Sequence, residues 1–315
     1  MEPLRRGYLS ALSANIMWGV FPLYFRALRP AGAVEVLAHR IVWSLISVAV
    51  LLTALSRWKA LKALAKDRKR LAGISVAAVF IAVNWGVYIF AVDTNHVVEA
   101  SLGYFINPLF VILLGVLVLR ERLRGLQWVA LGVGLVAVVV LSVDNGRVPW
   151  IALTLAGSFG TYSLIKKQLG LPAGEGLFLE SAVLTLPALA FLTWLAARHQ
   201  QTFGTVSVWH TVMLAGSGLL TAVPLLLFAE AANRVPLSGL GILQYLTPTL
   251  QLILGVLVFH EPMPPGRLAG FAIVWLALSI FTVDAIRHSR QRRATEAAAA
   301  AEEPATANSV STTTS

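Results

Sequence analysis

Four residues share one stripe of an otherwise apolar segment. Ser101, Tyr104, Asn107 and Pro108 recur at intervals of three or four residues within 97–119, so they fall on one side of the helix expected there. Their hydroxyl, phenol and amide groups can donate hydrogen bonds to a small polar molecule and accept hydrogen bonds from it. The chemistry that this stripe offers is recognition of a solute.

A second stripe of the same kind lies on the helix expected over 237–259. It consists of Gln244, Thr247, Pro248 and Gln251. Each proline lacks the N–H group that would bond the carbonyl four residues earlier, so we expect a helix break at Pro108 and another at Pro248. Broken backbone at membrane depth is tolerated where it is buried in protein or lines a water-filled cavity. The two breaks therefore predict a central polar cavity between these helices.

Two further helices contribute polar groups. In the segment "NWGVY", Asn84 and Tyr88 are four residues apart and share a face, and Thr221 precedes Pro224 in another apolar run. Such side chains can merely join helices, through hydrogen bonds that average less than about 1–2 kcal/mol each in membranes. That alternative stays open for each residue alone. For the group, the convergence of four helices on two prolines favours a substrate path.

Arg40 lies inside the apolar run 34–55, where a charge costs at least about 2.5–3.5 kcal/mol on insertion scales. Two interpretations remain open: Arg40 holds an anionic group of a substrate, or its side chain extends outward to the membrane surface. Glu180 occupies the corresponding place in the second half of the chain. The expected depths leave the two residues roughly 12 Å apart along the membrane normal, so we expect no permanent ion pair.

Sequence motifs for catalysis and for metal binding are absent. There is no phosphate-binding G-x-x-x-x-G-K-[ST] loop and no H-E-x-x-H pair, and His39 is the one histidine expected inside a span. Cysteine is also absent, which excludes disulfides. We therefore expect no cofactor, no metal site and no enzymatic activity.

Long apolar helices must position these residues. Hydrophobic residues make up 57% of the 315 residues and charged residues only 13%, whereas an ordinary soluble protein has roughly a quarter charged. Runs of roughly 20 apolar residues, enough to cross a ~30 Å hydrocarbon core, recur along the chain. We expect an all-α membrane protein with ten transmembrane helices. The expected spans are 8–26, 34–55, 71–93, 97–119, 125–143, 148–165, 176–196, 211–232, 237–259 and 266–286.

The net charge of +10 comes mainly from basic residues between the apolar runs, so it indicates topology rather than a nucleic-acid partner. The segments 57–70 and 120–124 are rich in Lys and Arg and lie in even-numbered loops. By the positive-inside rule these loops, and with them both termini, face the cytoplasm. The segment 287–315 is basic and then rich in alanine, acidic and Ser/Thr residues, so we expect a disordered cytoplasmic tail.

The sequence also contains an internal repeat. "NPLFVILLGVLVLRE" at 107–121 aligns without gaps on "TPTLQLILGVLVFHE" at 247–261, and the same frame places Asp144 on Asp284. This predicts two five-helix repeats, 8–144 and 148–284. Because each repeat has an odd number of spans, the second enters the bilayer from the opposite side, which predicts an inverted repeat.

Two motifs carry a family resemblance. "NWGVYIFAVDTNHVVEASLGYFINPL" at 84–109 and "GLGILQYLTPTLQ" at 239–251, within two five-span units, closely resemble the RarD branch of the EamA transporters, in the drug/metabolite transporter superfamily. The resemblance covers 8–284. It implies a ten-helix inverted-repeat carrier of the bacterial inner membrane, in a family linked to export or exchange of small metabolites and to drug sensitivity. The second copy of the first-helix motif, "SFGTYSLIKK", is weaker.

The predicted function is secondary transport of small metabolites or drugs by alternating access, as an exporter or permease. The expected substrate-binding residues are Tyr104, Asn107, Gln244, Thr247, Gln251, Asn84, Tyr88 and Arg40. The expected partners are a small-molecule substrate and the lipid bilayer, while a proton or other coupling ion and a homo-oligomer remain open. A membrane accessory or sensory subunit that transports nothing is the alternative, and a membrane enzyme is third because no acid–base or metal cluster supports it.

The predicted topology can be tested by cysteine labelling, because the natural chain has no cysteine to interfere. A single cysteine introduced near either terminus should resist a membrane-impermeant thiol reagent applied to intact cells and react after permeabilisation. Labelling of one terminus but not the other in intact cells would contradict both the even number of spans and the repeat.

Overall fold

The computed structural model describes residues 2–120, 123–144, 146–170, 172–235 and 237–311, and every regular element within them is a helix. In chain order the helices are α1 (Glu2–Gly19), α2 (Phe21–Ala27), α3 (Ala33–Ala54), α4 (Trp58–Lys66), α5 (Arg68–Asp93), α6 (Val97–Leu119), α7 (Gly125–Asp144), α8 (Trp150–Leu169), α9 (Ala173–Ala197), α10 (Val208–Ala232), α11 (Leu237–Gln244), α12 (Leu246–Ile253), the π-helical turn η1 (Leu254–Val258) and α13 (Pro265–Ser311).

Eight helical segments among the described residues are long and apolar enough to cross a membrane. The expected first and sixth spans are also helical, but they are less regular or less apolar. The first is divided at Val20, two residues before Pro22, into α1 and α2, and the sixth is α8, which carries Lys166 and Lys167 in its last turn. The all-helical membrane class is therefore confirmed, with eight clear spans.

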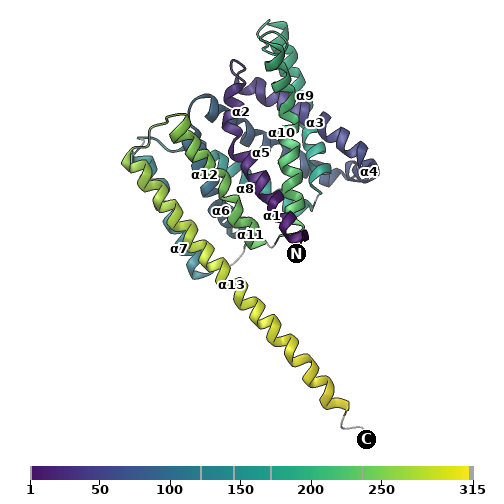
Figure 1. Ribbon diagram of the computed structural model, residues 1–315, viewed down its shortest axis with the longest axis vertical. Helices are drawn as coiled ribbons and strands as arrows, with labels where there is room; N and C mark the ends of the chain where they lie inside the picture. Colours follow the sequence, from purple (N-terminus) through teal and green to yellow (C-terminus); the bar gives the residue numbers. More distant parts are fainter. Residues whose placement is uncertain (1, 121–122, 145, 171, 236, 312–315) are drawn as a thin grey trace.

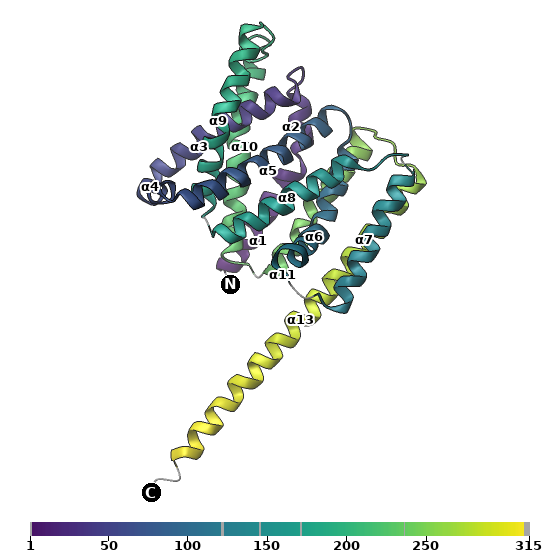
Figure 2. The same ribbon diagram turned by 180° about the vertical axis from the view of Figure 1, so that it is seen from behind.

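The helices form two layers that pack against each other in the middle of the bundle. Helix α1 packs against α10 and α12 on one side, whereas α8 packs against α5 and α6 on the other (Figure 1 and, from behind, Figure 2). Helix α3 contacts α10 of the first layer and α5 of the second and also packs against α9, and α12 contacts α6 directly. Helices α7 and α13 pack side by side along one edge.

Glycines allow the closest helix crossings. A Cβ atom added at Gly218 in α10 would lie 2.2 Å from the carbonyl carbon and oxygen of Trp43 in α3. At Gly103 in α6 it would lie 2.7 Å from the carbonyl oxygen of Ala152 in α8. Small residues let membrane helices approach until their backbones touch, and van der Waals packing then holds them together.

Two expectations about local structure are wrong. Helix α6 runs without interruption through Pro108, because the loss of one hydrogen bond leaves the neighbouring turns intact. In the matching helix the interruption falls at Tyr245, between α11 and α12, and Pro248 lies inside α12. Within the tail 287–315, helix α13 continues to Ser311 and extends away from the bundle (Figure 1), while the disorder expected for this tail stays a prediction. Its alanine-rich stretch 297–301 has high helix propensity.

The α3–α10 crossing gives a test of the packing. Gly218→Ala should destabilise the protein by about 1–3 kcal/mol, because the new methyl group would overlap the Trp43 carbonyl and force the helices apart. Gly132→Ala in α7 is the matched control, since a Cβ there meets nothing within 4 Å. The melting temperatures of both variants in detergent provide the comparison. Equal melting temperatures would show that the two helices are not in backbone contact.

Candidate functional site

Arg40 points into the bundle and is only 5% exposed. Its Nε donates a hydrogen bond to Thr221 Oγ1 in α10 at 2.8 Å. The guanidinium carbon lies 4.2 Å from the ring centre of Trp85 in α5 and 5.5 Å from that of Phe25 in α2. These are cation–π distances. Of the two interpretations of Arg40, extension to the membrane surface is therefore excluded.

Tyr88 and Tyr104 lie beside this arginine, with their ring centres 5.7 Å apart. The Tyr104 hydroxyl donates to Asn84 Oδ1 at 3.3 Å. Asn84 in turn donates from Nδ2 to the Leu155 carbonyl and to Ser158 Oγ in α8, both at 3.1 Å. The structure thus brings together four of the predicted residues, Arg40, Asn84, Tyr88 and Tyr104, and the last three lie on the helix faces that the spacing of three and four residues indicates.

The predicted residues of the second stripe have different positions. Gln251 is buried and its Nε2 donates to the Trp18 carbonyl in α1 at 3.2 Å. Thr247 is half-buried and donates to Asn15 Oδ1 in α1 at 2.9 Å. Gln244 ends α11 with an exposed side chain. It does not share the buried stripe of Gln251, because the interruption at Tyr245 separates the two helices.

Several buried polar atoms in this region have no hydrogen-bond partner among the described residues. They are the Tyr88 hydroxyl, Asn107 Oδ1 and Gln251 Oε1. The Gln251 side chain lies near the Tyr88 hydroxyl, and Asn107 Oδ1 faces Gly160 in α8. A buried polar atom without a partner costs roughly 1–3 kcal/mol, so such atoms are uncommon in native interiors. Other such atoms lie elsewhere in the described part of the chain, for example in Ser181 and His210, but Tyr88 lies beside both Gln251 and Arg40, where a polar molecule can bind. We call Arg40, Asn84, Tyr88, Tyr104, Asn107 and Gln251 the central polar group.

A second buried polar cluster was not predicted from the sequence. Glu180 in α9 is 1% exposed and forms an ion pair with Lys166 Nζ at 2.7 Å, while the Tyr162 hydroxyl donates to its other oxygen at 3.2 Å. Lys166 was assigned to a loop, but it lies in the last turn of α8. The available signal was the spacing of Tyr162 and Lys166, which are four residues apart and share a face. As expected, Arg40 and Glu180 have separate partners.

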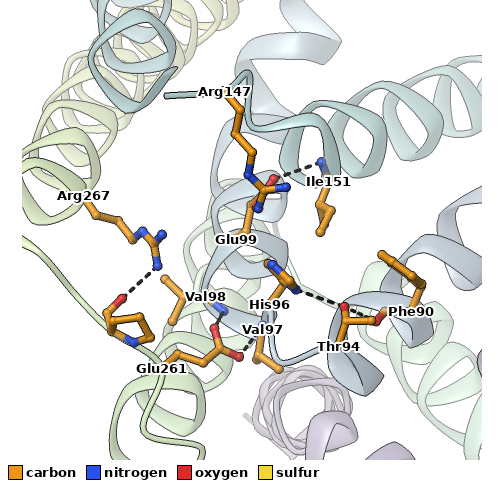
Figure 3. A network of polar contacts seen from close by, with 11 residues as sticks. Phe90, Thr94, His96, Val97, Val98, Glu99, Arg147, Ile151, Glu261 and Arg267 are labelled. Carbon is orange, nitrogen blue, oxygen red and sulfur yellow. Dashed lines mark hydrogen bonds and ion pairs between the residues drawn. The ribbon is translucent and has the colours of Figure 1, made fainter. Parts of the chain in front are cut away.

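A polar network joins the starts of α6 and α8 to neighbouring segments at one end of these helices (Figure 3). The Glu261 carboxylate, which follows η1, accepts hydrogen bonds from the backbone N–H groups of Val97 and Val98 at 2.6 and 2.8 Å. Glu99 similarly accepts from the Ile151 N–H at 3.1 Å and pairs with Arg147 at 3.3 Å. Each carboxylate satisfies the free N–H groups at the start of a helix. The matching residue Glu121 lies outside the described residues.

Two cavities in the described part of the chain lie away from the central polar group. One of about 110 Å³ adjoins the network at the bundle end and is lined in part by His96, Arg147 and Glu261. The other, about 540 Å³, is a groove along α6, α12 and α13, lined in part by Phe105, Tyr245 and Trp275. The central cavity expected from the prolines is neither of these two.

Comparison with known proteins agrees with this architecture. The model of the EamA-like transporter family matches the chain twice, over residues 5–143 and 148–283. A crystal structure only 17% identical in sequence has a TM-score of 0.58, covering 88% of this chain and 97% of its own. That likeness concerns the fold alone.

Curated relatives extend over nearly the whole chain. Protein RarD of Streptomyces exfoliatus is 55% identical over 296 residues, 94% of each chain. Protein RarD of Escherichia coli strain K12 is 39% identical, covering 91% of this chain and 97% of its own. The transporter YojE of Bacillus subtilis strain 168, whose function is uncharacterised, is 41% identical over 91% of this chain and 96% of its own. The chain is therefore a multi-pass membrane protein that belongs to the EamA-like transporter family and, within it, to the RarD branch.

Proposed function

We propose that this protein is a secondary transporter of small metabolites or drugs, of the exporter or permease type, in the bacterial inner membrane with both termini in the cytoplasm. Its relatives are named as transporters or as RarD proteins. The observation that carries the proposal is the central polar group, in which buried polar atoms lack partners at the meeting point of α3, α5, α6 and α12.

The proposed mechanism is alternating access between two inverted five-helix repeats, 8–144 and 148–284. Two observations support it. The family model matches one range in each half of the chain, and the helix contacts occur in mirrored pairs. Helix α8 packs against α5 and α6, just as α1 packs against α10 and α12, while α3 with α9 and α7 with α13 pair across the repeats. Rocking of such repeats can expose a central site to one side at a time.

In this proposal the Glu261 network is the closed end of the path. Glu261 fastens the segment after η1 to the start of α6, and Glu99 fastens the start of α8 to the same helix. Both connections join segments that must separate before a solute can pass at this end. Under the proposed topology this end faces away from the cytoplasm.

The central site is tested by alanine substitutions assayed in proteoliposomes. Asn107→Ala and Gln251→Ala should lower the transport of a carried solute by roughly fivefold to tenfold, the loss that corresponds to one hydrogen bond of about 1–1.5 kcal/mol. Thr249→Ala is the matched control, since this exposed residue of α12 donates its hydroxyl to the Tyr245 carbonyl one turn earlier.

The assay measures uptake and efflux of a panel of labelled metabolites and drugs, with and without an imposed pH gradient. A dependence on the gradient would identify the proton as a coupling ion. Unchanged transport in both site variants, at equal amounts of protein, would remove these two residues from the path. Absence of transport for the entire panel would favour a membrane subunit that carries nothing.

The closed end is tested by the accessibility of Ser101, which is fully buried one turn beyond Val97 and Val98. In a Ser101→Cys background, Glu261→Gln should raise the rate of labelling by an impermeant thiol reagent outside intact cells roughly tenfold. The reason is that a hydrogen bond to a charged group is worth about 1.5–3 kcal/mol. Asp93→Asn, which loses the exposed Arg29 ion pair, is the control. Equal labelling in both variants would contradict a gate at Glu261.

A further inference from the structure

The charge of Arg40 has no carboxylate partner among the described residues. On the helices around it, each acidic side chain is held elsewhere. Glu35 accepts from the Thr202 N–H, and the others form ion pairs: Asp93 with Arg29, Glu99 with Arg147, Glu175 with Arg57, Glu180 with Lys166, and Glu230 with Arg6. Thus Arg40 is a cation 5% exposed in an apolar bundle whose nearby carboxylates are all engaged by other groups.

The aromatic rings around Arg40 offset part of the free-energy cost of burying its charge. Trp85, Phe25 and Phe21 lie 4.2, 5.5 and 5.7 Å from the guanidinium carbon. Cation–π contacts contribute about 0.5–2 kcal/mol each, whereas the effective penalty for burying an ion is several kcal/mol. A bound anion would offset the rest of this penalty.

The hydrogen-bond donors of Arg40 match a carboxylate. An arginine has five N–H donors, yet Arg40 makes one hydrogen bond within the described residues, from Nε to Thr221. Its Nη1 and Nη2 remain available in the fork geometry that binds both oxygens of a carboxylate. The Tyr88 hydroxyl has no hydrogen bond of normal geometry but lies next to the Gln251 side chain; it is close enough to interact electrostatically with Arg40 and supplies a further donor.

The surroundings also indicate what the carboxylate is attached to. The contacts of Arg40 are the Thr221 hydroxyl and the rings of Phe21, Phe25 and Trp85, and within the described residues no second cation stacks on these three rings. One cation balances one negative charge, which favours a monoanion over a phosphate monoester. The rings of Phe25, Tyr88 and Tyr104 follow one another at centre distances of 6.0 and 5.7 Å. This aromatic wall suits an apolar body.

We propose that the transported substrate is an organic monocarboxylate with an apolar or aromatic body, whose carboxylate binds Arg40 and the Tyr88 hydroxyl. The proposal rests on the transport function proposed above and names the substrate class of the same site. Gln251 Oε1, which has no partner, would accept from an O–H or N–H group of such a substrate.

The test compares 3-phenylpropionate with its neutral amide, 3-phenylpropionamide, and with the cation 3-phenylpropylammonium. The full-length protein in detergent should be stabilised against heat by the carboxylate and not by the other two. Arg40→Gln and Arg40→Lys should each weaken carboxylate binding at least about tenfold, since both lose the paired N–H donors. Arg26→Gln is the matched control, because Arg26 also stacks on a ring, Phe259, and donates to the neutral Asn95.

Each outcome decides the inference. Equal binding of the acid and the amide, or an Arg40→Gln variant that binds the acid like the natural protein, would overturn it. So would failure of 3-phenylpropionate, hexanoate and indole-3-acetate to bind. The comparison of acid with amide uses the natural chain, so it holds even if a variant fails to fold. Transport of neutral solutes independent of Arg40 would overturn the substrate class alone, while carboxylate binding without transport in proteoliposomes would overturn the carrier function alone.

Discussion

The whole arrangement depends on the cost of placing polar groups among membrane-spanning helices, where only neighbouring helices can offer partners. The bundle offsets this free-energy cost by giving buried carboxylates cationic or N–H partners. Glu180 has Lys166, Glu175 has Arg57, and Glu261 has two backbone N–H groups of α6. Against this background the central polar group is distinctive, because its buried cation, Arg40, has no carboxylate partner among the described residues. This unbalanced charge makes the central polar group a place suited to an anionic ligand.

Helical periodicity made part of this site predictable. Spacings of three and four residues place Asn84 with Tyr88, and Tyr104 with Asn107, on inward faces, and the contact between Tyr104 and Asn84 follows from those faces meeting. The fixed rise per residue also sets the depth of a side chain, so the separation of Arg40 from Glu180 could be expected. The fold class and the helix positions could be predicted for the same reason, since the length of an apolar segment and its helical period are local properties of the sequence.

Features that depend on neighbouring helices could not be predicted from the sequence. The sequence does not show which carbonyls a proline leaves exposed, so Pro108 and Pro248 looked alike although only the second helix is interrupted, at Tyr245. That interruption moves Gln244 off the stripe of Gln251. The partners of Thr247 and Glu180 were missed because Asn15 and Lys166 lie on other helices, whose rotation is set by packing.

The two proposed repeats share a backbone plan but differ in their chemistry. In the frame that aligns Asn107 with Thr247, Arg40 corresponds to Glu180. Glu180 is neutralised by Lys166, which is itself part of the protein, whereas Arg40 is surrounded by rings and hydroxyl groups. A symmetric pair of ionic sites would hold both repeats equally tightly. The asymmetry at this pair of positions gives Glu180 in the second repeat a fixed partner within the protein and leaves the charge of Arg40 in the first repeat open to a solute, so binding and release can change the balance of forces between the two halves.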